Sequence, residues 1–507
     1  MNGVKRDLLT NFVASAWLGL ITFIFTPVYV HYLGLEAYGL IGLLAALQNS
    51  LGPFDLSIGQ ILTRELAQFN NGALAPQPAR DTIRSVEIIG AALAAALVFA
   101  IAMPAGWIAH AWLGPAELPL THIDTAIEIM ALIVGLRLLE GLYRGAATAL
   151  HRQVALNVVS ITCVTLKALG ALGLFVFVTR SVTAFFAWQA AVSALNVGLL
   201  VALVYVSLPA PELRGRFSWT QLERVWPFAF GLLIVSILAI AVMQTDKLLL
   251  SSLLPLASYG AYTLAATMAA APHLLGLPIL QSTQPRMANA LAAGDQIGLA
   301  HLFHGAAQLM TVAVGSASIV IIMFSADVLT FWLHDAALAA RLAPTLRILA
   351  FGSMLNALVW LPQAVQLIHA WTGLIIRVNA VAVAMLVPAL LLIAPRYGIE
   401  GAAWLWVAFN LIYFVGVAHL MFQRILTAER TRWQFDDIAR PLLTASIIAA
   451  VFKLTAPVDA PLWGRLLWIV AASAATLAGA AVAAPLVYSQ ARAMAAAMRQ
   501  RYSSRSD

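Results

Sequence analysis

Charged residues are scarce in this chain of 507 residues. Asp, Glu, Lys and Arg together make up 10% of it, hydrophobic residues make up 62%, and the mean hydropathy is +0.88. Globular proteins average about 25% charged and roughly 45–50% apolar residues. The scarcity excludes a soluble domain of any size. The net charge of +7 is spread over many short loops, so it predicts orientation in a membrane rather than binding to nucleic acid.

Residues and motifs that serve cofactors or catalysis are also missing. Cys163 is the only cysteine, so no intramolecular disulfide can form. The ten His residues show no ligand spacing, which predicts no metal site. No phosphate-binding loop and no hydrolase elbow are present. We therefore expect neither a bound cofactor nor catalytic residues, and the chain is predicted not to be an enzyme.

The sequence does contain long apolar runs, each long enough to cross ~30 Å of hydrocarbon as a helix. Because lipid offers no partner for backbone polar groups, the runs predict an all-α, polytopic membrane protein. The first run continues to about Val30 without a cleavage pattern, which favours an uncleaved span. We predict about 14 spans, with 12 or 13 as alternatives: 8–31, 36–61, 86–113, 122–147, 155–179, 182–208, 226–252, 257–284, 305–333, 344–369, 373–394, 399–423, 440–456 and 463–488.

The basic residues are distributed unevenly between the two sides of these spans. With the N-terminus inside, 20 of the 29 Lys and Arg residues fall on inward segments, 6 on outward segments and 3 inside spans. Positive residues favour the cytoplasmic side, so both termini are predicted to be cytoplasmic. The inward segment 285–304 alternates apolar and polar residues at helical spacing, and we expect an amphipathic helix on the membrane surface there.

A weak internal repeat relates the two halves of the chain. Residues 33–39 (LGLEAYG) and 254–260 (LPLASYG) share the pattern L-x-L-x-x-Y-G at an offset of 221 residues, and Arg64 and Arg286 lie 222 residues apart. With six spans per half, both copies have the same orientation, so the repeat is parallel. The alternative is that Tyr-Gly is a common pair at helix starts. The predicted domains are bundles at 1–208 and 226–423, a linker at 209–225, two additional helices at 424–488 and a basic tail at 489–507.

Ionisable residues inside predicted spans are the default candidates for function, because they are costly in lipid unless paired or hydrated. Arg137, Glu140 and Arg144 are spaced i, i+3 and i+7, so they share one helix face. They form either a brace within the bundle or a binding site. Lys167 has no charged neighbour within a helical turn, which favours a position facing an aqueous cavity. The other candidates are Asp55, Asp246 and Lys247.

Several short motifs resemble those of the polysaccharide-repeat flippases of the Wzx type. The first hairpin reads YLGLEAYG over residues 32–39, and DLSIG at 55–59 and RELA at 64–67 follow it. DKLLL at 246–250, YGAY at 259–262 and YGIEGAA at 397–403 are similar to their later hairpins. These flippases belong to the multidrug/oligosaccharidyl-lipid/polysaccharide exporter superfamily.

This resemblance implies two parallel six-helix repeats that face a central cleft and open alternately to either side. The implied cargo is an undecaprenyl-diphosphate-linked oligosaccharide, moved across the bacterial inner membrane for surface polysaccharide such as O-antigen, lipopolysaccharide or exopolysaccharide. Membrane lipids and, loosely, a polysaccharide polymerase are the expected partners. The expected cargo-binding residues are Arg64, Arg137, Arg144, Lys167 and Lys247, because Arg and Lys bind phosphate. Asp55, Glu140 and Asp246 are expected to couple transport to protons or sodium ions, or to brace the structure.

Two other functions stay open at this point. A multidrug or organic-cation antiporter of the same superfamily would share the fold. Drug exporters commonly carry a carboxylate in the first span, whereas residues 8–31 contain none. A polysaccharide polymerase or ligase would generally place catalytic Arg and His on a long outward loop, and none is predicted here.

Overall fold

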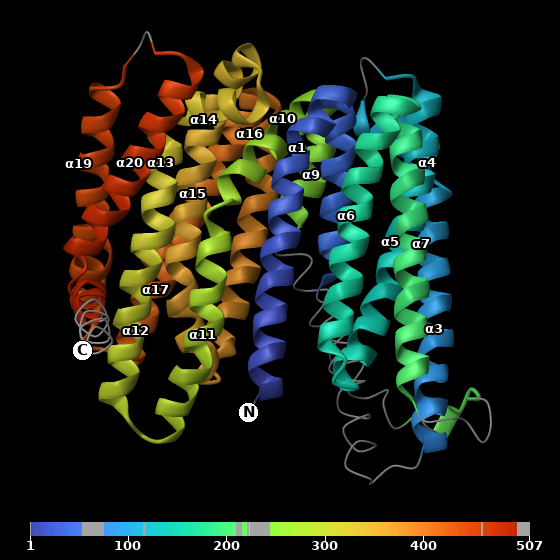
Figure 1. Ribbon diagram of the computed structural model, residues 1–507, viewed down its shortest axis with the longest axis horizontal. Coiled ribbons are helices and arrows are strands. Elements are labelled where there is room, and N and C mark those ends of the chain that lie inside the picture. Colours follow the sequence, from blue (N-terminus) through green and yellow to red (C-terminus); the bar gives the residue numbers. More distant parts are fainter. Residues whose placement is uncertain are drawn as a thin grey trace, which may run out of the picture. The chain divides into compact units, whose positions relative to one another are not determined.

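The computed structural model describes residues 2–52, 76–114, 118–208, 215–220, 223, 244–457 and 460–493. Over these ranges every regular element is a helix, and no strand occurs, which confirms the predicted all-α class (Figure 1). The chain forms two compact units, Met1–Ala261 and Tyr262–Asp507. Most of 209–243 lies outside the described residues, so the predicted linker and domain boundaries stay predictions.

In the first unit, α5 packs between α3 and α7, and α6 packs against α1 and α7 (Figure 1). Small residues allow these close contacts, because much of the buried face of α5 is Ala and Gly. The elements of this unit are α1 (Asn2–Ser50), α3 (Pro76–Ala102), α4 (Ala105–Trp107), η1 (Ile108–Leu113), α5 (Leu120–Ala149), α6 (Gln153–Phe177), α7 (Val182–Ser207), α9 (Thr245–Leu253) and the start of α10 (Leu256–Ala270).

In the second unit, α15 contacts α11, α13, α14 and α16, and α19 and α20 form a pair that packs on α13. Its elements are α11 (His273–Ala292), α12 (Gln296–Met310), η2 (Thr311–Gly315), α13 (Ser316–Met323), α14 (Ser325–Leu333), α15 (Ala336–Ile368), α16 (Thr372–Ile412), η3 (Tyr413–Val417), α17 (Ala418–Arg424), α18 (Arg430–Arg432), η4 (Trp433–Ala439), α19 (Arg440–Leu454) and α20 (Leu462–Ala483).

Two glycines interrupt the longest helices at predicted hairpins. Gly34 in α1 has φ 83° and ψ 173°, and Gly398 in α16 has φ 59° and ψ −144°. Both φ angles lie in a region that glycine adopts without the penalty of a Cβ atom. The helix before each glycine therefore ends there and a second one begins, as the predicted spans 8–31 and 36–61, and 373–394 and 399–423, require.

Eight helices of the described residues are long and apolar enough to span a membrane, or nine if the bent pair α10–α11 is one span. These helices make the chain a multi-pass membrane protein. α6 and α7 match the predicted spans 155–179 and 182–208 within two residues at each end. The span 226–252 falls largely outside the described residues, so the total of 14 stays a prediction.

The expected surface helix at 285–304 is wrong. α11 ends at Ala292, Gly294 has φ 73°, and α12 begins at Gln296. The Asp295 side chain caps α12 by accepting a hydrogen bond from the Gly298 backbone N–H at 2.8 Å. The sequence therefore forms a helical hairpin, and its second helix enters the core, where Phe303 and His304 are fully buried. The period of the pattern was helical, but the Gly–Asp pair marks a turn between two helices.

The two copies of the repeat motif cross each other within the first unit. A Cβ atom on Gly260 would lie 2.0 Å from the Leu35 carbonyl oxygen, and one on Gly39 would lie 2.6 Å from the Leu256 carbonyl oxygen. Leu35 and Leu256 occupy the same place in the two copies, as do Gly39 and Gly260. Each glycine therefore contacts the other copy's leucine, which is the reciprocity of a two-fold contact. This pairing supports the predicted duplication.

The predicted membrane orientation can be tested with introduced cysteines. His31 and Ala293 are both exposed and precede the turns at Gly34 and Gly294. In a Cys163→Ala background, we expect a membrane-impermeant maleimide added outside cells to label His31→Cys and to leave Ala293→Cys unlabelled until the membrane is opened. The physical reason is the 20-to-6 distribution of basic residues. Labelling of Ala293→Cys from outside would reverse the assigned orientation.

Candidate functional site

The face of α5 that was predicted to be charged carries a partly exposed ladder of ion pairs. Glu140 Oε2 lies 3.6 Å from Arg137 Nη1, and Glu140 Oε1 lies 3.7 Å from Arg144 Nη1. The side chains of Arg137 and Arg144 are 26% and 34% exposed, and that of Glu140 is 17% exposed. The helical spacing of these three residues therefore places them together, as predicted.

Helix α6 adds a hydroxyl and a third cation to this ladder. Arg144 Nη1 donates a hydrogen bond to Ser160 Oγ at 2.8 Å, and Ser160 Oγ donates to the Leu156 carbonyl at 2.9 Å. Lys167 lies seven residues after Ser160, on the same face of α6, and interacts electrostatically with Glu140 and Arg137. We call Arg137, Glu140, Arg144 and Lys167 the α5–α6 charge cluster.

Two polar contacts hold α6 against α1. Asn157 Nδ2 donates a hydrogen bond to Asn11 Oδ1 at 2.5 Å, and Trp17 Nε1 donates to Thr165 Oγ1 at 2.9 Å. These bonds lie on α6 on either side of Ser160. They restrict the rotation about its axis of the helix that carries Ser160 and Lys167.

The α5–α6 charge cluster is suited to binding an anion. It holds three cations and one carboxylate, so its net charge is +2 when all four groups are ionised. Both ion-pair distances to Glu140 exceed the usual N–H···O range of 2.7–3.2 Å. A guanidinium has five N–H donors, and the hydrogen bond and the ion pair of Arg144 both involve its Nη1. Arg144 therefore has donors left for a phosphate oxygen.

In the described part of the chain, the structure joins neither Asp246 nor Lys247 to this cluster. Asp246 and Lys247 lie in the first turn of α9, which packs on α1 and η1. Among the described residues, no hydrogen bond or ion pair links Lys247 to the cluster. Asp55 and Arg64 lie outside the described residues. The roles of all these residues stay predictions.

A buried carboxylate on α3 was missed by sequence reasoning. Glu87 accepts hydrogen bonds from the hydroxyls of Tyr143 at 2.9 Å and Tyr205 at 2.8 Å, and from Arg84 Nη1 at 3.0 Å. This network joins α3, α5 and α7 next to the charge cluster, since Tyr143 precedes Arg144. Only the Arg84–Glu87 spacing is visible in the sequence, because the two tyrosines are 56 and 118 residues away.

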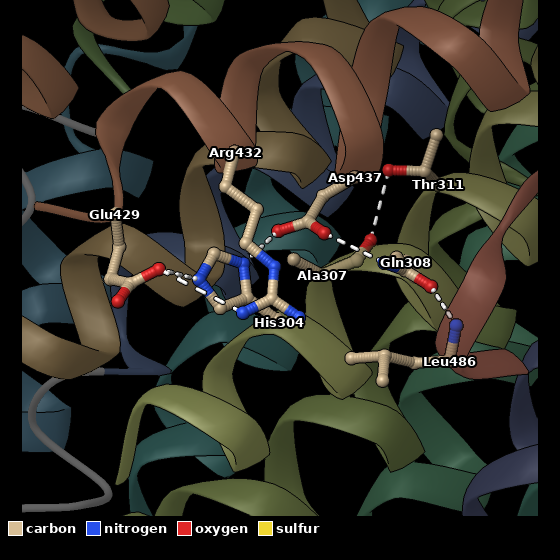
Figure 2. A network of polar contacts seen from close by, with 8 residues as sticks. All are labelled: His304, Ala307, Gln308, Thr311, Glu429, Arg432, Asp437 and Leu486. Atoms are coloured by element: carbon tan, nitrogen blue, oxygen red, sulfur yellow. Dashed lines mark hydrogen bonds and ion pairs between the residues drawn. The ribbon is translucent and has the colours of Figure 1, made fainter. Parts of the chain in front are cut away.

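A second network, in the second unit, was also missed (Figure 2). His304 on α12 is fully buried and contacts Asp437 of η4 through Nδ1 and Glu429 through Nε2, the latter at 2.9 Å. Gln308 donates a hydrogen bond to Asp437 Oδ1 at 2.9 Å and accepts one from the Leu486 backbone N–H at 2.8 Å. No local motif identifies these residues, since His304 and Asp437 are 133 residues apart.

A third polar contact ties the last two helices to α14. Asp327 accepts hydrogen bonds from Lys453 Nζ at 3.1 Å and Arg465 Nη1 at 3.3 Å. Lys453 also lies 5.1 Å from the centre of the Phe324 ring. The cations come from α19 and the start of α20, so this contact holds their connected ends. In the described part of the chain, no group of three or more His, Cys, Asp and Glu residues has metal-binding geometry.

Solved structures define the class of the fold. The chain is similar to the lipid II flippase MurJ in an inward closed conformation, with a TM-score of 0.70 and 11% identity over 93% of this chain and 97% of that one. It is also similar to a multidrug resistance MATE family transporter of the MOP superfamily (TM-score 0.57, 12% identity, 84% and 96% covered). A third similar structure is a mutant of the MATE transporter VcmN of Vibrio cholerae. Its TM-score is 0.59 and its identity 15%, over 86% of this chain and 100% of that one. The chain thus shares the fold of these three structures.

The family follows from the sequence profile that matches the chain. The profile of the polysaccharide biosynthesis protein family covers residues 5–291, which is more than half of the 507 residues and includes both copies of the repeat motif. The chain belongs to this family, and the resemblance drawn from its hairpin motifs is confirmed. No curated protein matches the chain in sequence.

Proposed function

We propose that the chain is a flippase that moves a lipid-diphosphate-linked oligosaccharide repeat unit from the inner to the outer leaflet of a bacterial inner membrane. Membership of the polysaccharide biosynthesis protein family supports a role in glycan assembly. The fold is shared with MurJ, a lipid II flippase. The product would be O-antigen, lipopolysaccharide or exopolysaccharide, and the polymerase that extends it would be a loose partner.

The observation that carries this proposal is the charge of the α5–α6 cluster. A diphosphate is a dianion or more, and Arg and Lys bind phosphate oxygens through charge-assisted hydrogen bonds. Arg137 and Arg144 project from one helix and Lys167 from its neighbour, so an anion can be bound from two sides. A cationic drug would meet repulsion from the same three side chains, which disfavours the antiporter alternative.

The membrane potential can drive this transport without ATP. An anion that leaves a negative cytoplasm gains about 2.3 kcal/mol per charge per 100 mV. A diphosphate with two charges therefore gains about 4–5 kcal/mol at 100 mV. Coupling to protons or sodium through Asp55 or Asp246 is a second source of energy that the proposal allows.

The test is translocation of a fluorescent lipid-diphosphate oligosaccharide in proteoliposomes, with Arg137, Lys167 and Lys247 each changed to Gln. Gln keeps much of the length and hydrogen bonding while it deletes the charge, so we expect at least a tenfold loss for Arg137→Gln and Lys167→Gln. Arg137→Lys should also lose activity if the forked guanidinium geometry matters. Arg152→Gln is the control, because Arg152 is an exposed cation at the start of α6.

Each other outcome of this assay points to a different function. Full translocation by all three Gln variants would contradict the cationic site. Transport of an organic cation without translocation of the lipid-linked oligosaccharide would establish an antiporter. Lengthening of the glycan without translocation would establish a polymerase.

A further inference from the structure

The carboxylates of Asp437 and Glu429 flank both ring nitrogens of His304 (Figure 2). His304 and Asp437 are fully buried, whereas the side chain of Glu429 is 27% exposed. Only Glu429 therefore connects this trio to the aqueous phase. The second oxygen of Asp437 accepts a hydrogen bond from Gln308, which leaves that carboxylate without a contact to water.

The number of protons in the trio follows from this geometry. A neutral imidazole has one N–H donor and one bare nitrogen, and an ionised carboxylate can only accept. With a neutral ring and two ionised carboxylates, one ring nitrogen and one carboxylate oxygen would face each other as two acceptors. Such a buried contact is costly, and one additional proton on the trio removes it.

We propose that Glu429, His304 and Asp437 form a proton-binding site, and that the bound proton latches the ends of α19 and α20 to α12. The latch acts on both helices. Asp437 lies in η4, which runs directly into α19, and Leu486, which donates to Gln308, follows α20. Loss of the proton places two acceptors in contact and releases both attachments together.

Few other charged groups lie near Glu429, His304 and Asp437 that could compensate the charge of the two carboxylates. Arg432 on α18 lies 3.9 Å from Glu429 and acts on Asp437 from a distance. Burial raises the pKa of the Asp437 carboxyl, while hydrogen bonds from His304 and Gln308 oppose that shift. His301, one turn earlier on α12, is exposed. Among the described residues of α11, α15 and 485–493, no charged side chain pairs with the trio.

The test is hydrogen–deuterium exchange of the full chain in nanodiscs between pH 7 and 9, corrected for the intrinsic pH dependence of exchange. The latched state holds one proton more than the open state in this range. Its population relative to the open state should therefore fall about tenfold per pH unit. We therefore expect protection from exchange to fall about tenfold per pH unit in peptides that cover 433–439 and 484–490. Peptides of α7 should show no such fall.

Glu429→Gln separates the proton site from a structural contact. An amide at position 429 donates to His304 Nε2 while His304 Nδ1–H donates to Asp437, so every group is satisfied without an additional proton. We expect this variant to stay protected and to lose its pH dependence. His301→Gln, the control on the same helix, should behave as the unmodified protein does. A pH-independent latch in the unmodified chain, or an unchanged pH dependence in Glu429→Gln, would overturn the proposal.

Discussion

Gly260→Ala is expected to lower the melting temperature of the chain by several degrees, at about 2–4 °C for each kcal/mol of lost stability. The added Cβ would lie 2.0 Å from the Leu35 carbonyl oxygen and 3.0 Å from the Gly39 backbone nitrogen. Both neighbours are backbone atoms, so no side-chain rotation can relieve the contact, and the two helices must separate. Overpacking of a well-packed site costs about 1–3 kcal/mol, and more where the backbone has to move.

Thermal unfolding of the purified protein, followed by tryptophan fluorescence, measures this effect. Gly173→Ala is the matched control, because Gly173 lies in α6 and a Cβ there would have no heavy atom within 4 Å. Alanine should stabilise that helix by about 0.5–1 kcal/mol. Gly39→Ala added to Gly260→Ala should cost less than it does alone, since the crossing is already open. A Gly260→Ala variant that melts with the unmodified protein would contradict the crossing.

Glu87→Leu is expected to destabilise the first unit by about 2–5 kcal/mol. The change leaves the hydroxyls of Tyr143 and Tyr205 without the oxygen that they share. A buried unpaired hydroxyl such as that of Tyr143 costs about 1–3 kcal/mol, and the part-buried hydroxyl of Tyr205, which also contacts Arg84, costs less. Arg84 loses its partner at little cost, because its side chain is 51% exposed. The same fluorescence melt measures the shift.

Two further variants make the result for Glu87 specific. Glu128→Leu removes an exposed carboxylate from α5 and should change the melting temperature little. Glu87→Leu combined with Tyr143→Phe and Tyr205→Phe should recover much of the lost stability, because replacing both partners of a hydrogen bond by apolar groups is nearly neutral. If the triple variant were no more stable than Glu87→Leu, the unpaired hydroxyls would not be the cause.

The contact between Gly39 and Gly260 and the hydrogen bonds of Glu87 both help to position the helices that carry the charge cluster. α5 carries Tyr143 next to Arg144, so the bonds of Glu87 set the position of the helix that presents the arginines. The crossing at Gly39 and Gly260 places the second copy of the repeat motif against α1. α1 in turn holds α6 through the hydrogen bonds of Asn11 and Trp17. Stability variants should therefore be assayed for translocation only where the protein stays folded.

Local patterns in the sequence were sufficient to predict several of the helices and the ladder of ion pairs on α5. Apolar runs predicted α6 and α7 within two residues at each end, and the hairpin glycine Gly34 marked the break in α1. The spacing of Arg137, Glu140 and Arg144 placed them on one face, because a helix repeats every 3.6 residues and the geometry needs no other element. The same kind of reasoning failed at 285–304, where helical spacing continued across the turn at Gly294.

Contacts between distant helices were decided only by the tertiary structure. His304 and Asp437 are separated by 133 residues, and Tyr205 and Glu87 by 118, so no period or motif links them. Each pair depends on which helices pack together and on their rotation about their own axes, and that choice is made by the whole apolar surface of the bundle. The sequence by itself determined an all-helical membrane protein with a cationic face on α5. The packing of the helices decided which carboxylates are buried and which side chains of other helices form hydrogen bonds with them.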